Sequence, residues 1–257
     1  MLQGWLKQGV PAADVHVVEP VETLRARAQK LGVTVYAAAD DLAGELLPTV
    51  VVIAVKPQAI ANVLPPYRRF AKGGATVLSI AAGTLISTIE TILGPGTAVL
   101  RCMPNTPAAI GKGMLVCCTN RYVDRERLAF CEELLSSSGR VAFVDDEALM
   151  DAVTGVSGSG PAYVFHFIES LTAAAISVGL PESLAKELAL QTVYGSAAMA
   201  AHSDESAAEL RVKVTSPNGT TAAALNVLMG DDRLKRLMTD AVIAATNRSR
   251  ELGRSSG

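Results

Sequence analysis

The sequence is poor in aromatic residues, in basic runs and in histidine. Aromatic residues make up 4% of its 257 residues, and 23 Lys plus Arg stand against 25 Asp plus Glu. No cluster of Lys and Arg forms the basic patch that a nucleic acid requires, so we expect no nucleic-acid partner. The three histidines, His16, His166 and His202, are too scattered to indicate a metal site.

Cysteines and long apolar runs are also few. The four cysteines, Cys102, Cys117, Cys118 and Cys131, show no Cys-x-x-Cys spacing. They are typical of small buried residues in a reducing compartment rather than of disulfides or metal ligands. No segment reaches the roughly 18 apolar residues of a membrane span, and the N-terminus has no signal-peptide pattern. We therefore expect a cytoplasmic chain with no membrane partner.

A glycine-rich phosphate-binding motif is missing as well. A dinucleotide-binding domain normally opens with a strand, Gly-x-Gly-x-x-Gly and a helix, and nothing before residue 15 has this pattern. The chain begins with Leu2–Gly9, which is typical of the second half of a helix with a terminal glycine. We expect about 20 residues of a complete βαβ unit to be missing. One explanation for these missing residues is that Met1 is an internal methionine of a longer chain.

Strands and helices alternate in the first half of the chain. Continuous apolar runs such as Thr49–Val55 are typical of parallel strands covered on both faces. The pattern predicts a doubly wound, Rossmann-type α/β domain over residues 1–145. Its predicted strands are Val15–Val18, Val33–Tyr36, Thr49–Val55, Ala75–Ile80, Ala98–Cys102, Met114–Cys118 and Arg140–Val144, and its predicted helices are Glu22–Leu31, Ala59–Phe70, Thr84–Leu93 and Asp124–Ser137.

The second half has almost no strand pattern. Ala, Leu, Met and Val recur at helical spacing after Asp146, which predicts an all-α domain over residues 146–257. Ala-rich helices with few charges suit a packed bundle that can also bury a second copy of the chain, so we expect a homodimer or a higher homo-oligomer. The predicted helical segments are 147–155, 161–178, 182–201, 205–213, 219–229 and 231–252.

Three predicted strands end in small or polar residues. The segments are Ala54–Pro57, Ser79–Gly83 and Arg101–Pro107. Ligands of open α/β sheets bind beyond the carboxyl ends of the strands. Ordinary turns explain one such segment more easily than three, so we expect a ligand site at this edge.

An acidic residue ends the strand Val15–Val18. Glu19 occupies the place where a dinucleotide fold often binds the adenine ribose, and a carboxylate there favours NAD over NADP. Arg25 and Arg27 nearby leave NADP open. The alternative is that Glu19 is a solvated loop residue.

Two longer motifs are more specific. They are Asp151–Tyr163, with the sequence DAVTGVSGSGPAY, and Val214–Thr221, with the sequence VTSPNGTT. Together with the three strand-end segments, in this order and spacing, they resemble pyrroline-5-carboxylate reductase from about residue 10 to residue 252. The resemblance implies an N-terminal dinucleotide-binding domain, a C-terminal dimerisation domain and NAD(P)H-dependent reduction of 1-pyrroline-5-carboxylate to L-proline.

The resemblance also assigns residues. The implied cofactor contacts, for NADP or NAD, are Glu19, Asp41, Ala54, Val55, Lys56, Pro57, Ile80, Ala81, Ala82 and Asn105. The implied substrate-binding residues are Val214, Ser216, Gly219, Thr220 and Thr221, with Asn105 and Thr106 nearby.

The substrate needs a carboxylate site and a hydrogen-bond donor at its imine nitrogen. A helix beginning at Thr220 offers backbone N–H groups for the carboxylate. Thr221 is the candidate catalytic residue, as the hydroxyl that polarises the nitrogen. The alternative is that Thr220 and Thr221 merely cap the helix; capping and ligand binding can coexist, and we expect both. Lys56 as a proton donor is a weaker hypothesis than Lys56 as a cofactor contact.

Two rival functions remain at this point. A β-hydroxyacid type of dehydrogenase shares the two-domain plan, but usually carries a Lys–Asn pair where this chain has Gly158–Tyr163. A chain without the glycine loop could instead act only as a catalytically impaired dimerising partner.

Overall fold

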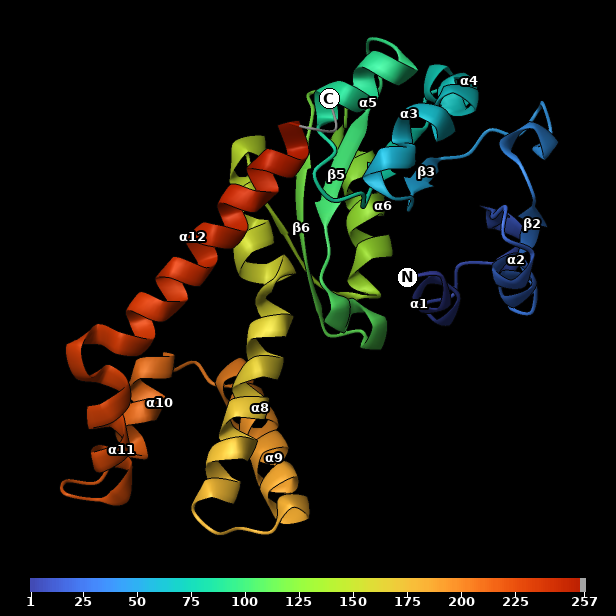
Figure 1. The fold of residues 1–257 in the computed structure, drawn as a ribbon. Coiled ribbons are helices and arrows are strands. Elements are labelled where there is room, and N and C mark those ends of the chain that lie inside the picture. The colour runs from blue at the N-terminus through green and yellow to red at the C-terminus, as the bar shows by residue number, and fades with distance from the viewer. Residues whose placement is uncertain (255–257) are drawn as a thin grey trace. The chain divides into compact units, whose positions relative to one another are not determined.

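The chain folds into two compact units. The computed structural model describes residues 1–254. One unit, the sheet unit, comprises residues 1–158 together with the segment from Ala245 onward, and the other, the helical unit, comprises residues 159–244. Figure 1 shows the order of elements along the chain. An α/β domain followed by helices confirms the predicted fold class.

A five-stranded sheet forms the centre of the sheet unit. Its order is β3-β4-β5-β6-β7. All neighbours pair in parallel except β5 and β6, which are antiparallel. The connection from Met103 to Gly113 explains this departure from a fully parallel sheet, because it is shorter than the crossover that parallel strands need. The strands are β3 (Val50–Ile53), β4 (Thr76–Ser79), β5 (Val99–Met103), β6 (Gly113–Thr119) and β7 (Gly139–Phe143).

The first residues form a smaller parallel pair. Strands β1 (His16–Val18) and β2 (Thr34–Tyr36) make a two-stranded sheet of their own. Helix α2 (Glu22–Gln29) connects them, and α1 (Leu2–Lys7) precedes them. Gly9 follows α1 with a φ of 97°, a left-handed conformation that glycine adopts readily.

Helices cover both faces of the larger sheet. They are α3 (Ile60–Val63), α4 (Arg68–Lys72), α5 (Ile86–Leu93) and α6 (Arg125–Ser136). The prediction of one helix over Ala59–Phe70 was wrong. Pro65 and Pro66 divide that segment, because proline lacks the N–H of a helix interior and its ring clashes with the preceding turn.

Alternate residues of the strands build two separate cores. Val77 and Val99 belong to the core that includes α5, whereas Leu78 and Leu100 belong to the core that includes α6. All four residues of β4 are buried, as expected for a central strand covered on both sides.

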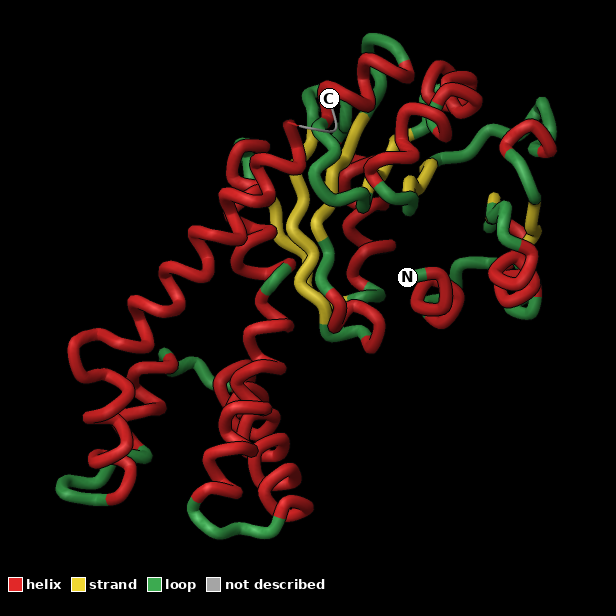
Figure 2. Tube along the Cα trace, in the orientation of Figure 1, coloured by secondary structure: helices red, strands yellow, loops and turns green. Residues whose placement is uncertain are grey.

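The helical unit consists of helices without a core of comparable size. Figure 2 shows that this part of the chain carries no strand. Among residues 159–244 only Ala185 and Ala189 are buried. The helices of the second half are α7 (Met150–Val153), α8 (Gly160–Ser177), α9 (Glu182–His202), α10 (Ala207–Lys213), α11 (Thr220–Met229) and α12 (Arg233–Arg254).

The unit boundaries differ from the predicted domain ranges. A boundary near residue 146 was expected, whereas the compact units divide between Gly158 and Ser159 and again between Ala244 and Ala245, within α12. Ser249 explains the second division, because its hydroxyl donates to Asp151 Oδ1 at 2.7 Å. In the described part of the chain, the helices are all too short or too polar to cross a membrane.

The four cysteines yield a prediction. All are buried and unpaired, and burial raises the pKa of Cys131 to about 11. A hydrogen bond that the Cys117 thiol donates to Cys102, followed by burial, raises the pKa of Cys117. Because the thiolate is the reactive form, we expect Ellman's reagent at pH 8 to label no thiol of the native protein and four in guanidinium chloride. Rapid labelling of the native protein would contradict this packing.

Candidate functional site

Two candidate loops leave the same edge of the sheet. Strands β3 and β4 are parallel, with Ile53 opposite Ser79, and Ile80 N donates to Ile53 O at 3.0 Å. The segments Ala54–Pro57 and Ile80–Ala82 therefore begin side by side. This is the edge where open α/β sheets bind ligands.

The side chains on these loops are small or cationic. Ala54, Lys56 and Ala82 are exposed, whereas Ala81 is 4% exposed and packs into the core. Short exposed side chains let a ligand approach the backbone closely. Gly83 ends the second loop with a φ of 75°, which requires glycine in practice. Val55, Pro57 and Ile80 are half-buried, and Val55 and Ile80 pack against the cores of the sheet unit.

A cavity adjoins both loops. Its volume is about 310 Å³, and Pro57 and Thr84 lie in its wall. The Thr84 hydroxyl is buried and has no hydrogen-bond partner within the described residues. The cavity is lined by Pro57, Gln58, Ile60, Ala61, Thr84, Thr88 and Ile92.

Glu19 and Asp41 each hold a local turn. Glu19 Oε1 accepts from Val21 N at 2.9 Å at the end of β1, and Asp41 Oδ2 accepts from Ala38 N at 2.9 Å. The Arg25 guanidinium donates to Glu19 O at 2.8 Å. A cation is therefore anchored beside the residue that the sequence singled out for the ribose, although β1 is not paired with the five-stranded sheet.

The Asn105 side chain has protein partners. Its Oδ1 accepts from Met114 N at 2.9 Å, and its Nδ2 donates to Ser157 O at 3.2 Å. Ser157 belongs to the π-helix Thr154–Gly158, which follows α7. Asn105 thus ties the segment after β5 to the Asp151–Tyr163 motif, while its neighbour Thr106 is exposed.

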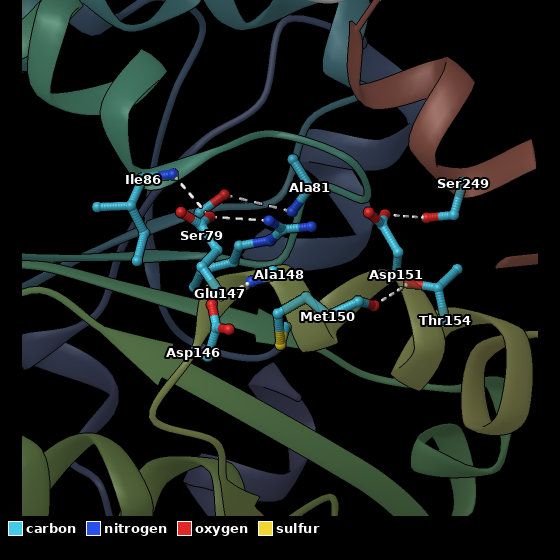
Figure 3. Close-up of polar contacts among 11 residues, drawn as sticks. Ser79, Ala81, Ile86, Asp146, Glu147, Ala148, Met150, Asp151, Thr154 and Ser249 are labelled. Carbon is cyan, nitrogen blue, oxygen red and sulfur yellow. Dashed lines mark hydrogen bonds and ion pairs between the residues drawn. The ribbon is translucent and has the colours of Figure 1, made fainter. Parts of the chain in front are cut away.

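A polar network lies at the start of this motif, and the sequence had not singled it out. Figure 3 shows Glu147 beside Ile86, and Asp151 beside Ser249. Glu147 Oε1 accepts from Ile86 N at 2.9 Å and from the Arg101 guanidinium at 2.8 Å. The available clue was Arg101 itself, because an arginine within an apolar strand needs a buried counter-charge.

The candidate substrate residues form one turn in the helical unit. Gly219 N donates to Ser216 O at 3.1 Å. Pro217 and then Asn218, with a φ of 58°, occupy the central positions, which is the pattern of a type II turn. A Cβ on Gly219 would collide with Ser216 Oγ in its present rotamer, so a larger residue there would displace the Ser216 hydroxyl. Val214, which is exposed, directly follows α10.

Helix α11 begins at Thr220 without a side-chain cap. Its N-cap residue is Gly219, and no side chain accepts a hydrogen bond there. The expectation that Thr220 and Thr221 cap the helix, alone or together with ligand binding, is therefore wrong, because both lie inside its first turn. The first N–H groups of α11 stay available to an anion.

Comparison with known proteins gives the family. A model described as pyrroline-5-carboxylate reductase dimerisation matches residues 147–252, and one described as NADP oxidoreductase, coenzyme F420-dependent, matches residues 1–83. The chain is 39% identical to pyrroline-5-carboxylate reductase of Pseudomonas aeruginosa, across 100% of this chain and 93% of that relative. It is 35% identical to that of Haemophilus influenzae, across 98% and 92%.

Solved structures agree with the sequence relatives. A pyrroline-5-carboxylate reductase from Coxiella burnetii has a TM-score of 0.92 and 34% identity, covering 98% of this chain and 93% of that one. Plasmodium falciparum pyrroline carboxylate reductase, with NADP bound, has a TM-score of 0.81 and 29% identity, covering 97% and 92%. Fold and loops define an NAD(P)H-dependent oxidoreductase. The chain belongs to the pyrroline-5-carboxylate reductase family.

The Asn105 contacts give a stability prediction. Asn105→Ala should lower the free energy of unfolding by about 1–3 kcal/mol, because it leaves Met114 N and Ser157 O without their partner. Denaturant titration of the whole chain measures the change. Thr106→Ala, at the exposed neighbouring position, is the control and should change stability by about 0.5 kcal/mol or less. Equal stability of the two variants would contradict a structural role for the Asn105 amide.

Proposed function

We propose that this chain reduces the C=N bond of 1-pyrroline-5-carboxylate with NAD(P)H to give L-proline, the last step of proline biosynthesis. The observation that carries the proposal is the uncapped N-terminus of α11 behind the Ser216–Gly219 turn. The family membership and the paired loops after β3 and β4 support the same reaction. Each part of the substrate has a candidate partner on the chain.

The α11 N-terminus would bind the substrate carboxylate. Backbone N–H groups at a helix start point towards an anion, and the helix dipole favours negative charge there. Ser216 adds a hydroxyl beside the Gly219 backbone. In this arrangement no arginine is needed for the carboxylate, and Val214 and Thr220 would bound the same site.

Thr221 would then donate a hydrogen bond to the imine nitrogen. It is half-buried one residue inside α11, next to the proposed carboxylate site. Negative charge grows on the nitrogen as hydride reaches the carbon, so a donor fixed at that atom stabilises the transition state more than the ground state. The proton itself would come from water or from the substrate.

The loops after β3 and β4 would hold the nucleotide. They fit such a group because exposed Ala54 and Ala82 allow close approach, while Lys56 offers a cation without an ion-pair partner among residues 1–254. When bound, NAD(P)H supplies the hydride. The remaining proposed contacts are Val55, Pro57, Ile80, Ala81 and Asn105, with Glu19 and Asp41 for the adenosine part.

The choice between NADP and NAD depends on the region after β1. Glu19 would accept from the ribose hydroxyls of NAD, whereas Arg25 would attract the additional phosphate of NADP. Arg25 is already held beside Glu19 by its bonds to Glu19 O and Pro20 O. Both nucleotides therefore remain proposed cofactors.

A spectrophotometric assay of the nicotinamide cofactor tests the reaction and the role of Thr221. With 1-pyrroline-5-carboxylate as substrate, we expect NADPH or NADH to be oxidised, which is followed as a loss of absorbance at 340 nm. With β-hydroxyacids as substrates, we expect no reduction of NADP+ or NAD+. Thr221→Ala should lower kcat by about 100-fold, the usual effect of losing one transition-state donor, while changing KM by less than about threefold. Thr221→Ser should recover most of kcat. An unchanged kcat in Thr221→Ala would overturn the proposed role.

We also propose that the chain works as a homodimer or a dimer-based higher oligomer. The helical unit buries only two side chains of its own, yet Phe165, Tyr194 and Val227 are 59%, 67% and 63% exposed. Apolar surface of this extent is stabilised when another copy covers it. The dimerisation model matched over residues 147–252 supports this reading.

The oligomer can be tested by sedimentation. We expect the unaltered chain to sediment as a dimer or larger species at micromolar concentration. Phe165→Glu should shift it towards monomer, because a carboxylate would have to be buried without a partner. Lys186→Gln is the control on α9, since the Lys186 side chain is 64% exposed and pairs with Glu182. A monomeric unaltered chain would contradict the proposal.

A cytoplasmic location is part of the same proposal. All four cysteines are free and buried in the described structure. Unpaired thiols are typical of proteins that function in a reducing compartment.

A further inference from the structure

The first backbone N–H group of helix α5 donates its hydrogen bond to a residue from a distant part of the chain. Its N-cap residue is Leu85, whose side chain cannot accept a hydrogen bond. Glu147 Oε1, 61 positions later, accepts from Ile86 N at 2.9 Å instead. Figure 3 shows this bond at the point where the loop after β4 enters the helix. Glu147 therefore supplies the cap that the local sequence lacks.

The same oxygen neutralises a buried cation. The Arg101 guanidinium on β5 lies 2.8 Å from Glu147 Oε1, and the Arg101 side chain is only 5% exposed. Arg101 is opposite Ser79, the last residue of β4. A buried guanidinium is costly without a counter-charge, so this ion pair fixes where the Glu147 carboxylate can lie.

The loop between β4 and α5 is consequently held at both ends. At its start, Ala81 N donates to Ser79 Oγ at 3.4 Å. At its end, the bond from Ile86 to Glu147 is shorter and charge-assisted, and such bonds are about twice as strong as neutral ones. Between these points lie Ile80, Ala81 and Ala82, the proposed cofactor contacts.

We propose that Glu147 is a positioning residue for nucleotide binding: its carboxylate, oriented by Arg101, caps α5 and so holds the Ile80–Ala82 backbone in its binding conformation. This inference rests on the proposed function, because it requires that loop to contact NAD(P)H. Glu147 acts through the loop and does not itself contact the substrate. All the residues involved belong to the sheet unit.

Two substitutions of Glu147 separate its two bonds. Glu147→Ala removes both, and the Kd for NADPH or NADH, measured by nicotinamide fluorescence, should rise by about tenfold or more. The KM for 1-pyrroline-5-carboxylate should change by less than about twofold, because the proposed substrate loop is unaltered. Glu147→Gln keeps an acceptor for Ile86 N but loses the counter-charge of Arg101. It should lower Tm while leaving nucleotide Kd within about threefold of the unaltered chain.

A second pair of variants removes the bond from the other side. Ile86→Pro deletes the N–H at the first helical position, where proline is well tolerated, and Leu85 already has the extended conformation that precedes proline. Ile86→Ala keeps the N–H but removes a similar amount of packing. We expect Ile86→Pro to bind nucleotide about fivefold or more weakly than Ile86→Ala. If Glu147→Ala does not fold, this pair still tests whether the bond from Ile86 N to Glu147 affects nucleotide affinity.

Asp146 provides the matched control. Its carboxylate accepts from Ala148 N at 2.9 Å in the same turn but does not bond to α5. Asp146→Ala should therefore leave nucleotide Kd within about twofold, since no bond to the loop is lost.

The outcomes distinguish the two proposals. Wild-type nucleotide affinity in folded Glu147→Ala, or equal affinity of Ile86→Pro and Ile86→Ala, would overturn the role of Glu147 and leave the proposed function standing. An equal loss of affinity in Asp146→Ala would also overturn it, by showing a general loss of structure. Failure of the unaltered chain to bind either nucleotide would overturn the proposed function and this inference together.

Discussion

The parallel pairing of β3, β4 and β5 is the constraint on which the candidate cofactor site depends. Parallel neighbours end at the same edge, so the pairing of Ile53 with Ser79 places two loops side by side. The strands can pair in this way only because both faces are covered, by α5 on one side and α6 on the other. Burial of the sheet thus determines where a ligand can bind.

The same burial requires a counter-charge for Arg101, and Glu147 supplies it beside the proposed cofactor site. Arg101 lies on a central strand where a lone cation is costly, and Glu147 reaches it from the turn before α7. Because that carboxylate also binds Ile86 N, the neutralisation of Arg101 and the conformation of the loop after β4 are coupled. In the role that we propose for Glu147, one carboxylate both neutralises Arg101 and holds the loop of the proposed cofactor site.

The helical unit differs from the sheet unit in how little of its apolar surface it buries. Its helices leave large apolar side chains exposed and bury almost none of their own, which is the basis for our proposal that another copy covers them. Within it, the Ser216–Gly219 turn is set by local backbone chemistry, namely Pro217 and the positive φ of Asn218. This turn can keep its shape without a large core beneath it.

Local patterns in the sequence by themselves determined much of this protein. Apolar runs placed every strand to within two residues, helical spacing placed α8, α9 and α11, and the VTSPNGTT motif indicated the family that the comparisons established. Pro65 and Pro66, which divide Ala59–Phe70, are equally visible in the sequence. Tertiary structure alone decided the other features. The acceptor for Ile86, the counter-charge of Arg101 and the partners of Asn105 all lie far along the chain. Propensity and periodicity describe a residue's near neighbours, whereas these bonds exist only once packing has brought distant segments together.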